Sequence, residues 1–315
     1  MTPTATSSPV IAILPRISIC LMATTIIVSA KVEMQEPPRF SGGIELINVT
    51  ATVTDDEGRF VGDLSKEDFS VFEDGKRQNI SQFTRERVPV SLGILLDASG
   101  SMNIERLTSA KAAITRLVFD LLDKADELFF VEFGYSARLT QGWTGDRTLI
   151  RHALENVRAP TGDTALYDAI ALALPTAQEG RYVKKALLVI SDGNDTRSVV
   201  SASELRQSIV ESDVLVYALG LETLGRTTGD PASRPNVSAL RRITDETGGR
   251  TEVVRGVAGL DAAVTRIAAE FRQQYSLGYT STSAKDGRWH SIRVDVRNRR
   301  LNVRARRGYT AGLSG

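Results

Sequence analysis

The stretch VSLGILLDASGS, residues 90–101, decides the fold of this 315-residue chain. Residues 90–96 are almost entirely apolar, which predicts a buried strand, and the small residues that follow predict a turn at its end. Asp97, Ser99 and Ser101 occupy alternate positions of that turn. One carboxylate and two hydroxyls on one loop form an oxygen-only ligand set, which suits Mg²⁺, Mn²⁺ or Ca²⁺ and does not suit zinc or copper.

Two distant segments can complete this ligand set. Thr164 lies in the sequence GDTAL, residues 162–166, and Asp192 follows the apolar run 188–191. Asp97 and Asp192 thus both come directly after an apolar run that predicts a strand. We therefore expect both carboxylates at strand ends, with Thr164 on a loop between them in sequence.

Each candidate ligand also has an ordinary structural explanation. Asp97 and Ser99 could cap the helix that starts near Asn103, because Asp and Ser are good N-cap residues. Thr164 could cap the helix that follows it, and Asp192 could belong to a simple turn. These alternatives apply to the residues singly. The shared order and strand context favour a common cation site.

The three segments resemble the metal-ion-dependent adhesion site of von Willebrand factor A domains. The family pattern is Asp-x-Ser-x-Ser after the first strand, a Thr on a second loop and an Asp-Gly pair after a later strand. Its five positions are filled here by Asp97, Ser99, Ser101, Thr164 and Asp192. The resemblance implies that Ser99 and Ser101 bind the cation directly and Thr164 directly or through water. It also implies that both carboxylates hold ordered waters or switch between direct and indirect contact.

The chemistry of such a site favours recognition. Neutral hydroxyls leave a divalent ion incompletely neutralised, and Mg²⁺ prefers octahedral oxygen coordination with some waters retained. An Asp or Glu of another protein can then complete the coordination shell. The sequence therefore predicts Mg²⁺, or Mn²⁺ or Ca²⁺, as the cofactor, and a protein ligand that supplies a carboxylate as the partner.

An enzyme is the main alternative from another class. Ser99 or Ser101 could be a nucleophile, but the chain has no Gly-x-Ser-x-Gly around them and only two histidines. His152 lies in a predicted helix and His290 stands near the C-terminus, so neither is placed by the sequence as a base for Ser99. A two-metal hydrolase would need more His and carboxylate ligands near the site. We expect no catalysis.

Residues 87–273 alternate between predicted strands and helices. Apolar residues recur at helical spacing from Ile104 to Leu121, directly behind the Asp97 loop. Repeated strand–helix units predict a doubly wound, mainly parallel sheet with helices on both faces, a Rossmann-like α/β fold. Further strands are expected over 128–133 and 186–191, and further helices over 149–157 and 165–177. The alternation continues over 204–210, 214–219, 237–247 and 260–271. Ligands of such folds gather at the carboxyl ends of the strands.

The two flanks, residues 44–86 and 274–311, alternate like β structure. Neither is long enough to bury a core alone, so we expect them to pair into one smaller β module around the α/β domain at 87–273. The alternative is that each flank extends an edge of the central sheet. This plan is similar to a group of exported bacterial proteins, on the motifs VTD (53–55), DFSVFEDG (68–75), TALYDAI (164–170), LGY (277–279) and RRGY (306–309).

The N-terminus predicts export. An apolar segment at 17–30 follows Arg16 and ends in Ala30, which is typical of a signal peptide over 1–30, with a linker at 31–43. An uncleaved membrane anchor is the alternative, and it would be the only membrane contact. Cys20 is the one cysteine of the chain, so the exported part has none and relies on its core. We expect a periplasmic, envelope-associated or secreted protein.

Composition limits the partners. The chain has 42% hydrophobic and 24% charged residues with a net charge of +1, which argues against nucleic acid as the partner. Eight arginines between Arg288 and Arg307 predict a basic β face, either solvated or able to bind polyanions. The sequence thus predicts an exported, non-catalytic protein-binding module. The alternative function is a structural or assembly factor of a cell-envelope complex, in which the metal is mainly structural.

Overall fold

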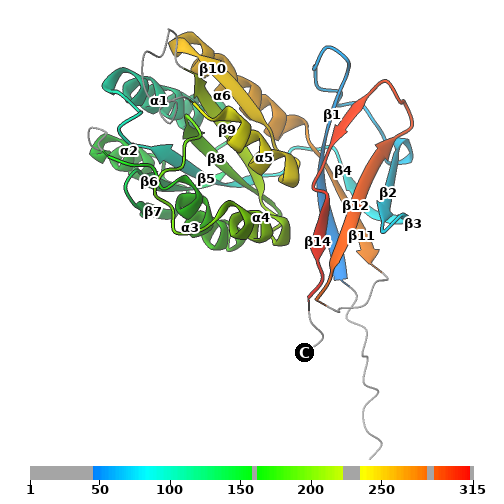
Figure 1. Ribbon diagram of the computed structural model, residues 1–315. Helices are drawn as coiled ribbons and strands as arrows, with labels where there is room; N and C mark the ends of the chain where they lie inside the picture. The colour runs from blue at the N-terminus through cyan, green and yellow to red at the C-terminus, as the bar shows by residue number, and fades with distance from the viewer. Residues whose placement is uncertain (1–44, 158–161, 223–234, 282–286, 313–315) are drawn as a thin grey trace, which may run out of the picture. The chain divides into compact units, whose positions relative to one another are not determined.

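The computed structural model describes residues 45–157, 162–222, 235–281 and 287–312 (Figure 1). Residues 44–315 group into one compact unit by their contacts. The expected signal peptide at 1–30 and linker at 31–43 lie outside the described residues. The expected domain boundaries remain predictions.

A six-stranded sheet lies at the centre of the α/β part, in the order β10-β9-β8-β5-β6-β7 (Figure 1). All neighbouring pairs are parallel except β6 and β7, which are antiparallel. Every residue of β5 and nearly every residue of β8 is buried, because helices cover both faces of the sheet. The expected doubly wound, mainly parallel fold is confirmed. The strands are β5 (Val90–Asp97), β6 (Glu127–Phe133), β7 (Ala137–Thr144), β8 (Lys184–Ser191), β9 (Leu215–Glu222) and β10 (Thr251–Arg255).

The helices form two layers with separate cores. One core packs α1 (Ile104–Arg116), α2 (Arg147–Asn156) and α6 (Gly256–Gln273) against the sheet. The other packs α3 (Leu166–Gln178), α4 (Ala202–Glu211) and α5 (Val237–Thr247) against the opposite face. The helix expected over 104–121 is α-helical only to Arg116 and ends in a π-helical turn, Leu117–Leu121.

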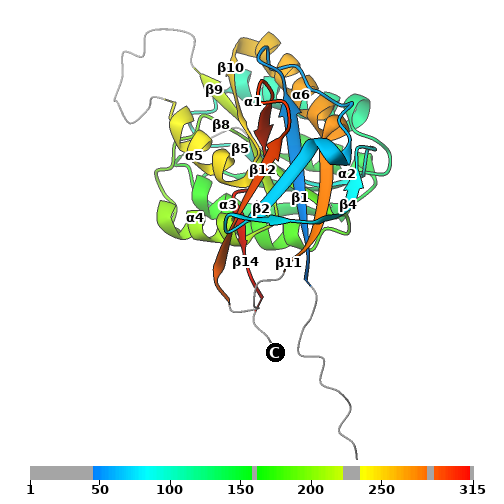
Figure 2. The same cartoon turned by 90° about the vertical axis from the view of Figure 1, so that its right-hand side faces the viewer.

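The flanks build a β sandwich (Figure 2). One sheet has the order β13-β1-β11-β4 and the other β14-β12-β2-β3, and apolar side chains of both share one core. Strands from the two ends of the chain are direct neighbours, so the expected β module is confirmed. No flank strand among the described residues joins the six-stranded sheet, and the edge-extension alternative is wrong. The elements are β1 (Glu45–Thr54), η1 (Lys66–Asp68), β2 (Phe69–Glu73), β3 (Lys76–Gln78), β4 (Ile80–Thr84), β11 (Tyr275–Ser281), β12 (Trp289–Val296), β13 (Asn302–Arg304) and β14 (Gly308–Thr310).

A buried carboxylate joins the sandwich to the α/β part. Glu270 of α6 is fully buried, and its Oε1 accepts hydrogen bonds from Thr52 of β1 (2.9 Å), Tyr217 of β9 (2.9 Å) and Arg304 of β13 (2.6 Å). Its Oε2 lies 3.0 Å from Nε of Arg250. Two guanidiniums and two hydroxyls therefore neutralise and solvate this carboxylate in place of water.

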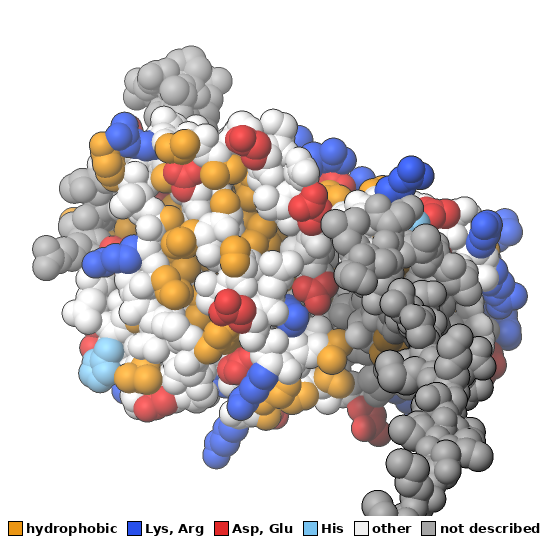
Figure 3. All heavy atoms as spheres, turned by 90° about the horizontal axis from the view of Figure 1, so that it is seen from below, with side chains coloured by type: hydrophobic (Ala, Val, Ile, Leu, Met, Phe, Trp, Pro, Cys, Tyr) orange, Lys and Arg blue, Asp and Glu red, His pale blue; other side chains and the backbone are white. Residues whose placement is uncertain are grey.

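Charged side chains of both signs are spread over the surface. Figure 3 shows acidic and basic groups interspersed on the face that is lowest in Figure 1. Basic groups gather at the right-hand edge of that view, on the side where Figure 1 has β2 and β3. No helix within the described ranges is both long and apolar enough to cross a membrane.

Glu270→Gln should destabilise the protein by about 3–5 kcal/mol, because it removes the buried carboxylate that pairs with Arg304 and one of the two carboxylates that pair with Arg250. Urea unfolding at pH 7 measures the loss. Glu211→Gln, at the exposed end of α4, is the control and should change stability by less than about 0.5 kcal/mol. Equal effects of the two variants would contradict the assigned role of Glu270.

The buried Lys184 makes the stability of the protein vary with pH in the alkaline range. Its side chain is buried at the start of β8, where Nζ donates to the Phe271 carbonyl (2.8 Å). Burial, with a smaller contribution from Arg87, lowers the pKa of Lys184 from 10.5 to about 8. Between these two values the unfolded chain binds a proton that the folded chain does not, so stability rises with pH.

Lys184→Met should remove this rise, which amounts to about 2–3 kcal/mol across the interval. Unfolding by urea at several pH values between 8 and 10.5 compares the variant with the parent. Lys185→Met changes the neighbouring lysine and should keep the parental pH dependence. A Lys184→Met protein whose stability still rises in parallel with the parent would refute the assignment.

Candidate metal centre

The ends of β5 and β8 bring two of the predicted segments side by side. The strands are parallel neighbours, and Leu96 stands opposite Ile190 in their register. Asp97 and Ser191 therefore end their strands at the same edge of the sheet, and Asp192 follows directly. This is the carboxyl edge, where we expected a ligand to gather.

The Asp97 carboxylate is held by both segments. Its Oδ1 accepts from the Ser99 amide (2.9 Å) and its Oδ2 from the Ser191 hydroxyl (2.6 Å). The same Ser191 hydroxyl accepts from the Gly193 amide (3.0 Å). One serine thus connects the loop after β5 to the loop after β8.

Burial sets the electrostatics of the site. Asp97 and Ser99 are fully buried, and Asp192 is almost fully buried. Burial, with a smaller contribution from the negative charge of nearby Asp192, raises the pKa of Asp97 to about 6, against the hydrogen bonds from Ser191 and Ser99, which lower it. Two carboxylates removed from water in this way favour a bound cation, which would stabilise their charged forms.

The serine hydroxyls face each other on the first loop. Oγ of Ser99 and Oγ of Ser101 lie 3.0 Å apart. Between them, the Gly100 amide donates to the Gly162 carbonyl (3.0 Å), two residues before Thr164. The first loop therefore contacts the second loop through its backbone.

Thr164 is fixed by the loop after β8. Its amide donates to the Thr196 hydroxyl (2.9 Å), and its carbonyl accepts from the amides of Thr196 (2.9 Å) and Arg197 (3.1 Å). Thr164 is buried. Hydrogen bonds between the backbones and side chains of the three loops thus bring all three predicted segments together.

Asp192 is placed by a turn that requires glycine at the next position. Its Oδ1 accepts from the Asn194 amide (3.1 Å), and its carbonyl accepts from the Asn236 amide (2.8 Å). Gly193 has φ +84°, and a Cβ there would lie 2.4 Å from the Asn236 carbonyl oxygen. Only glycine fits this position, which explains the Asp-Gly pair of the motif.

The capping alternatives are wrong. Helix α1 has Asn103 as its N-cap, whose side chain accepts from the Arg106 amide. Helix α3 has Ala165 at its N-cap position and no side-chain cap. Asp97, Ser99 and Thr164 therefore have no capping role.

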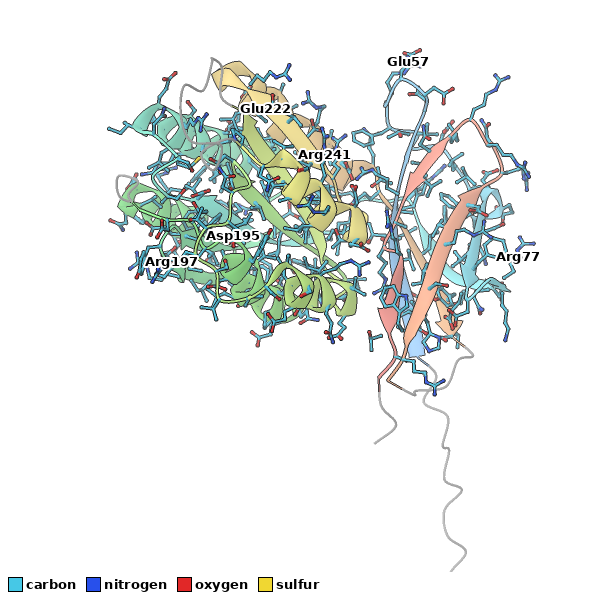
Figure 4. All side chains as sticks on the ribbon, in the orientation of Figure 1. Glu57, Arg77, Asp195, Arg197, Glu222 and Arg241 are labelled. Atoms are coloured by element: carbon cyan, nitrogen blue, oxygen red, sulfur yellow. The ribbon has the colours of Figure 1, made fainter. Side chains whose placement is uncertain are left out.

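The sequence did not single out two acidic residues that hold the loops around the candidate ligands. Asp168, in the first turn of α3, accepts from the amides of Val199 (3.0 Å) and Val200 (2.9 Å). Asp195 accepts from the Tyr167 amide (3.2 Å). Figure 4 places Asp195 close to Arg197 on the loop after β8. Asp168 lies in the TALYDAI motif, and Asp195 lies three residues after Asp192. The sequence does not show their roles, because their partners are about 30 residues away in the chain.

Neither histidine belongs to this site. His152 is exposed on α2, 3.5 Å from Glu155. His290 of β12 lies 2.7 Å from Asp74, and with Glu73 these residues form a group that could hold a metal ion within the sandwich. The oxygens of Glu73 accept from the hydroxyls of Ser281 (2.8 Å) and Tyr309 (3.3 Å), so protein donors already bind this carboxylate.

Comparison with known proteins identifies the α/β part. Residues 92–194 match the family model of the von Willebrand factor type A domain. The match contains Asp97, Ser99, Ser101, Thr164 and Asp192. The chain therefore contains a domain of the von Willebrand factor type A family, as its sequence predicted.

The individual relatives are distant. The uncharacterized protein sll0103 of Synechocystis is 28% identical over 142 residues, which are 44% of this chain and 32% of that protein. The chain thus spans about a third of that relative. A von Willebrand factor type A structure from Catenulispora acidiphila is 13% identical at TM-score 0.48, covering 87% of this chain and 75% of that one. The hypothetical protein BatB of Bacteroides thetaiotaomicron is 24% identical at TM-score 0.45, covering 57% and 98%.

Ser191→Ala should cost about 1–3 kcal/mol of stability in metal-free buffer, because it removes the donor to a buried carboxylate and the acceptor of the Gly193 amide. Urea unfolding in EDTA measures it. Ser203→Ala, on the exposed first turn of α4, serves as the matched control. The connection between the two loops would be disproved by equal stabilities of the two variants.

Proposed function

We propose that this protein is a binding module in which a divalent cation recognises a carboxylate of a partner protein. The main support is the Asp97 carboxylate. It is buried where β5 and β8 end side by side, and it accepts hydrogen bonds from both loops. Its hydrogen-bond partners are a hydroxyl and an amide. A cation beside it would supply the compensating charge.

The proposed ligands are oxygens only. Ser99 and Ser101 offer two hydroxyls 3.0 Å apart, and Thr164 offers a third from the neighbouring loop. Asp97 and Asp192 supply the negative charge, directly or through water. Hard oxygen donors suit Mg²⁺, with Mn²⁺ and Ca²⁺ as alternatives. Because several donors are neutral, the cation keeps positive charge and attracts an outside Asp or Glu.

The proposed role is recognition without catalysis. The matched family consists generally of interaction modules, and both histidines lie away from the candidate ligands. The same site could instead hold an envelope assembly together, which would make the metal structural. Export is part of the proposal and depends on residues 17–30, which lie outside the described residues.

Manganese tests the metal site and its open coordination position together. Mn²⁺ bound to protein with exchangeable waters enhances the relaxation of water protons, so titration should give a saturable enhancement. Asp97→Ala should weaken Mn²⁺ binding by at least about tenfold, because it removes one of two charged donors. A Glu-containing peptide in excess should lower the enhancement of the parent by displacing a water.

Asp163→Ala is the matched control for this titration. Asp163 is exposed and stands next to Thr164, so its loss removes a nearby charge without removing a proposed ligand. It should keep the parental affinity. Unchanged Mn²⁺ binding by Asp97→Ala would refute the site. An Asp97→Ala protein that loses its fold together with its Mn²⁺ affinity, and a parent in which the peptide displaces no water, would favour the structural metal.

A further inference from the structure

The outward face of the sheet β14-β12-β2-β3 carries an unusual set of side chains. Side chains alternate along a strand, and in β12 His290, Ile292 and Val294 are buried. Trp289 and Arg293 consequently project to the other side, into solvent. Figure 2 looks onto β12 and β2 from this side. We call Trp289, Arg293, Phe72 and Arg77 the aromatic–arginine face.

Three of these residues form a row across three strands. Arg293 of β12 stands opposite Phe72 of β2, and Phe72 stands opposite Arg77 of β3. The Arg293 guanidinium lies over the Phe72 ring, with Cζ 4.2 Å from the ring centroid. Figure 4 shows Arg77 pointing away from the protein. An aromatic ring with an arginine on each side is thus held in place by the strand register.

Trp289 adds a flat apolar surface at the other end of the face. Trp289 is 42% exposed. Gly308 of the neighbouring strand lies directly under the ring, since a Cβ there would fall 2.2 Å from Cζ2 of Trp289. The indole is therefore laid against the sheet with one side open. Trp289 and Arg293 are four positions apart, a distance of about 13 Å along the strand.

The face has positive charge in excess. Arg297, Arg299 and Arg300 follow the end of β12 and are exposed. Asp295 pairs with Arg293, and Asp68 lies 4.0 Å from Arg297. The gathering of basic side chains in Figure 3 lies on this side of the sandwich.

We propose that the aromatic–arginine face binds an anionic polysaccharide. An open indole can stack on the apolar face of a sugar ring, as aromatic side chains stack on other flat ligands. Guanidiniums bind carboxylates through two parallel hydrogen bonds, and a uronic-acid chain presents carboxylates at regular intervals. The spacing along the strand suits an extended chain with several sugars. This binding is independent of the cation site.

Titration of the full chain with polygalacturonic acid, followed by calorimetry, tests the proposal. Trp289→Ala and the double variant Arg77→Ala/Arg293→Ala should each weaken binding by at least about tenfold. Arg138→Ala removes an equally exposed arginine from β7 of the α/β part and should leave binding unchanged. Asp97→Ala and EDTA should also leave it unchanged, which separates this face from the proposed metal site.

Three further measurements identify the ligand class. Dextran, a neutral polysaccharide, should bind at least about tenfold more weakly than polygalacturonic acid, because it lacks carboxylates. Phosphatidylglycerol vesicles and a single-stranded oligonucleotide should not compete. The proposal would be overturned if polygalacturonic acid did not bind. It would also be overturned if binding depended on the arginines alone and the vesicles or the oligonucleotide bound equally well. Thermal unfolding of Trp289→Ala checks its fold, and the arginine variant remains decisive if that protein is unstable.

Discussion

The burial of the Asp97 carboxylate is the constraint on which the candidate site depends. A charged group removed from water needs compensating donors or charge, and at Asp97 these come from two different loops. The parallel pairing of β5 and β8 places these loops side by side, and the Ser191 hydroxyl also accepts from the Gly193 amide. The site is therefore a consequence of how two parallel strands end, and its ligands are positioned by the sheet.

Glu270 and Asp97 differ in the charge of the groups that bind them. Both carboxylates are fully buried, but Glu270 is bound by Arg250 and Arg304, whereas Asp97 accepts from the neutral Ser99 amide and Ser191 hydroxyl. Glu270 thus has its charge balanced within the fold, which suits a structural role between sandwich and helix. Asp97 has a raised pKa and neutral donors, which suits a site that takes up a cation.

Much of the architecture could be predicted because it follows from local patterns. Buried parallel strands such as β5 and β8 are continuous apolar runs, and alternation in the flanks indicated a separate β module. The strands β7 and β10 were missed because they lie at the edges of the sheet. There, one side is exposed and only part of the pattern is apolar, as the mostly half-exposed residues of β7 show.

The sequence alone determined the type of fold, the five candidate ligands and the order in which they follow their strands. These features depend on neighbours in the chain, where residue type and spacing are sufficient. Only the tertiary structure decided that Ser191 bonds to Asp97, that Glu270 meets Arg304, and that Arg293, Phe72 and Arg77 form one row. Such contacts depend on strand register and on long-range pairing between the two ends of the chain, which periodicity within one segment does not contain.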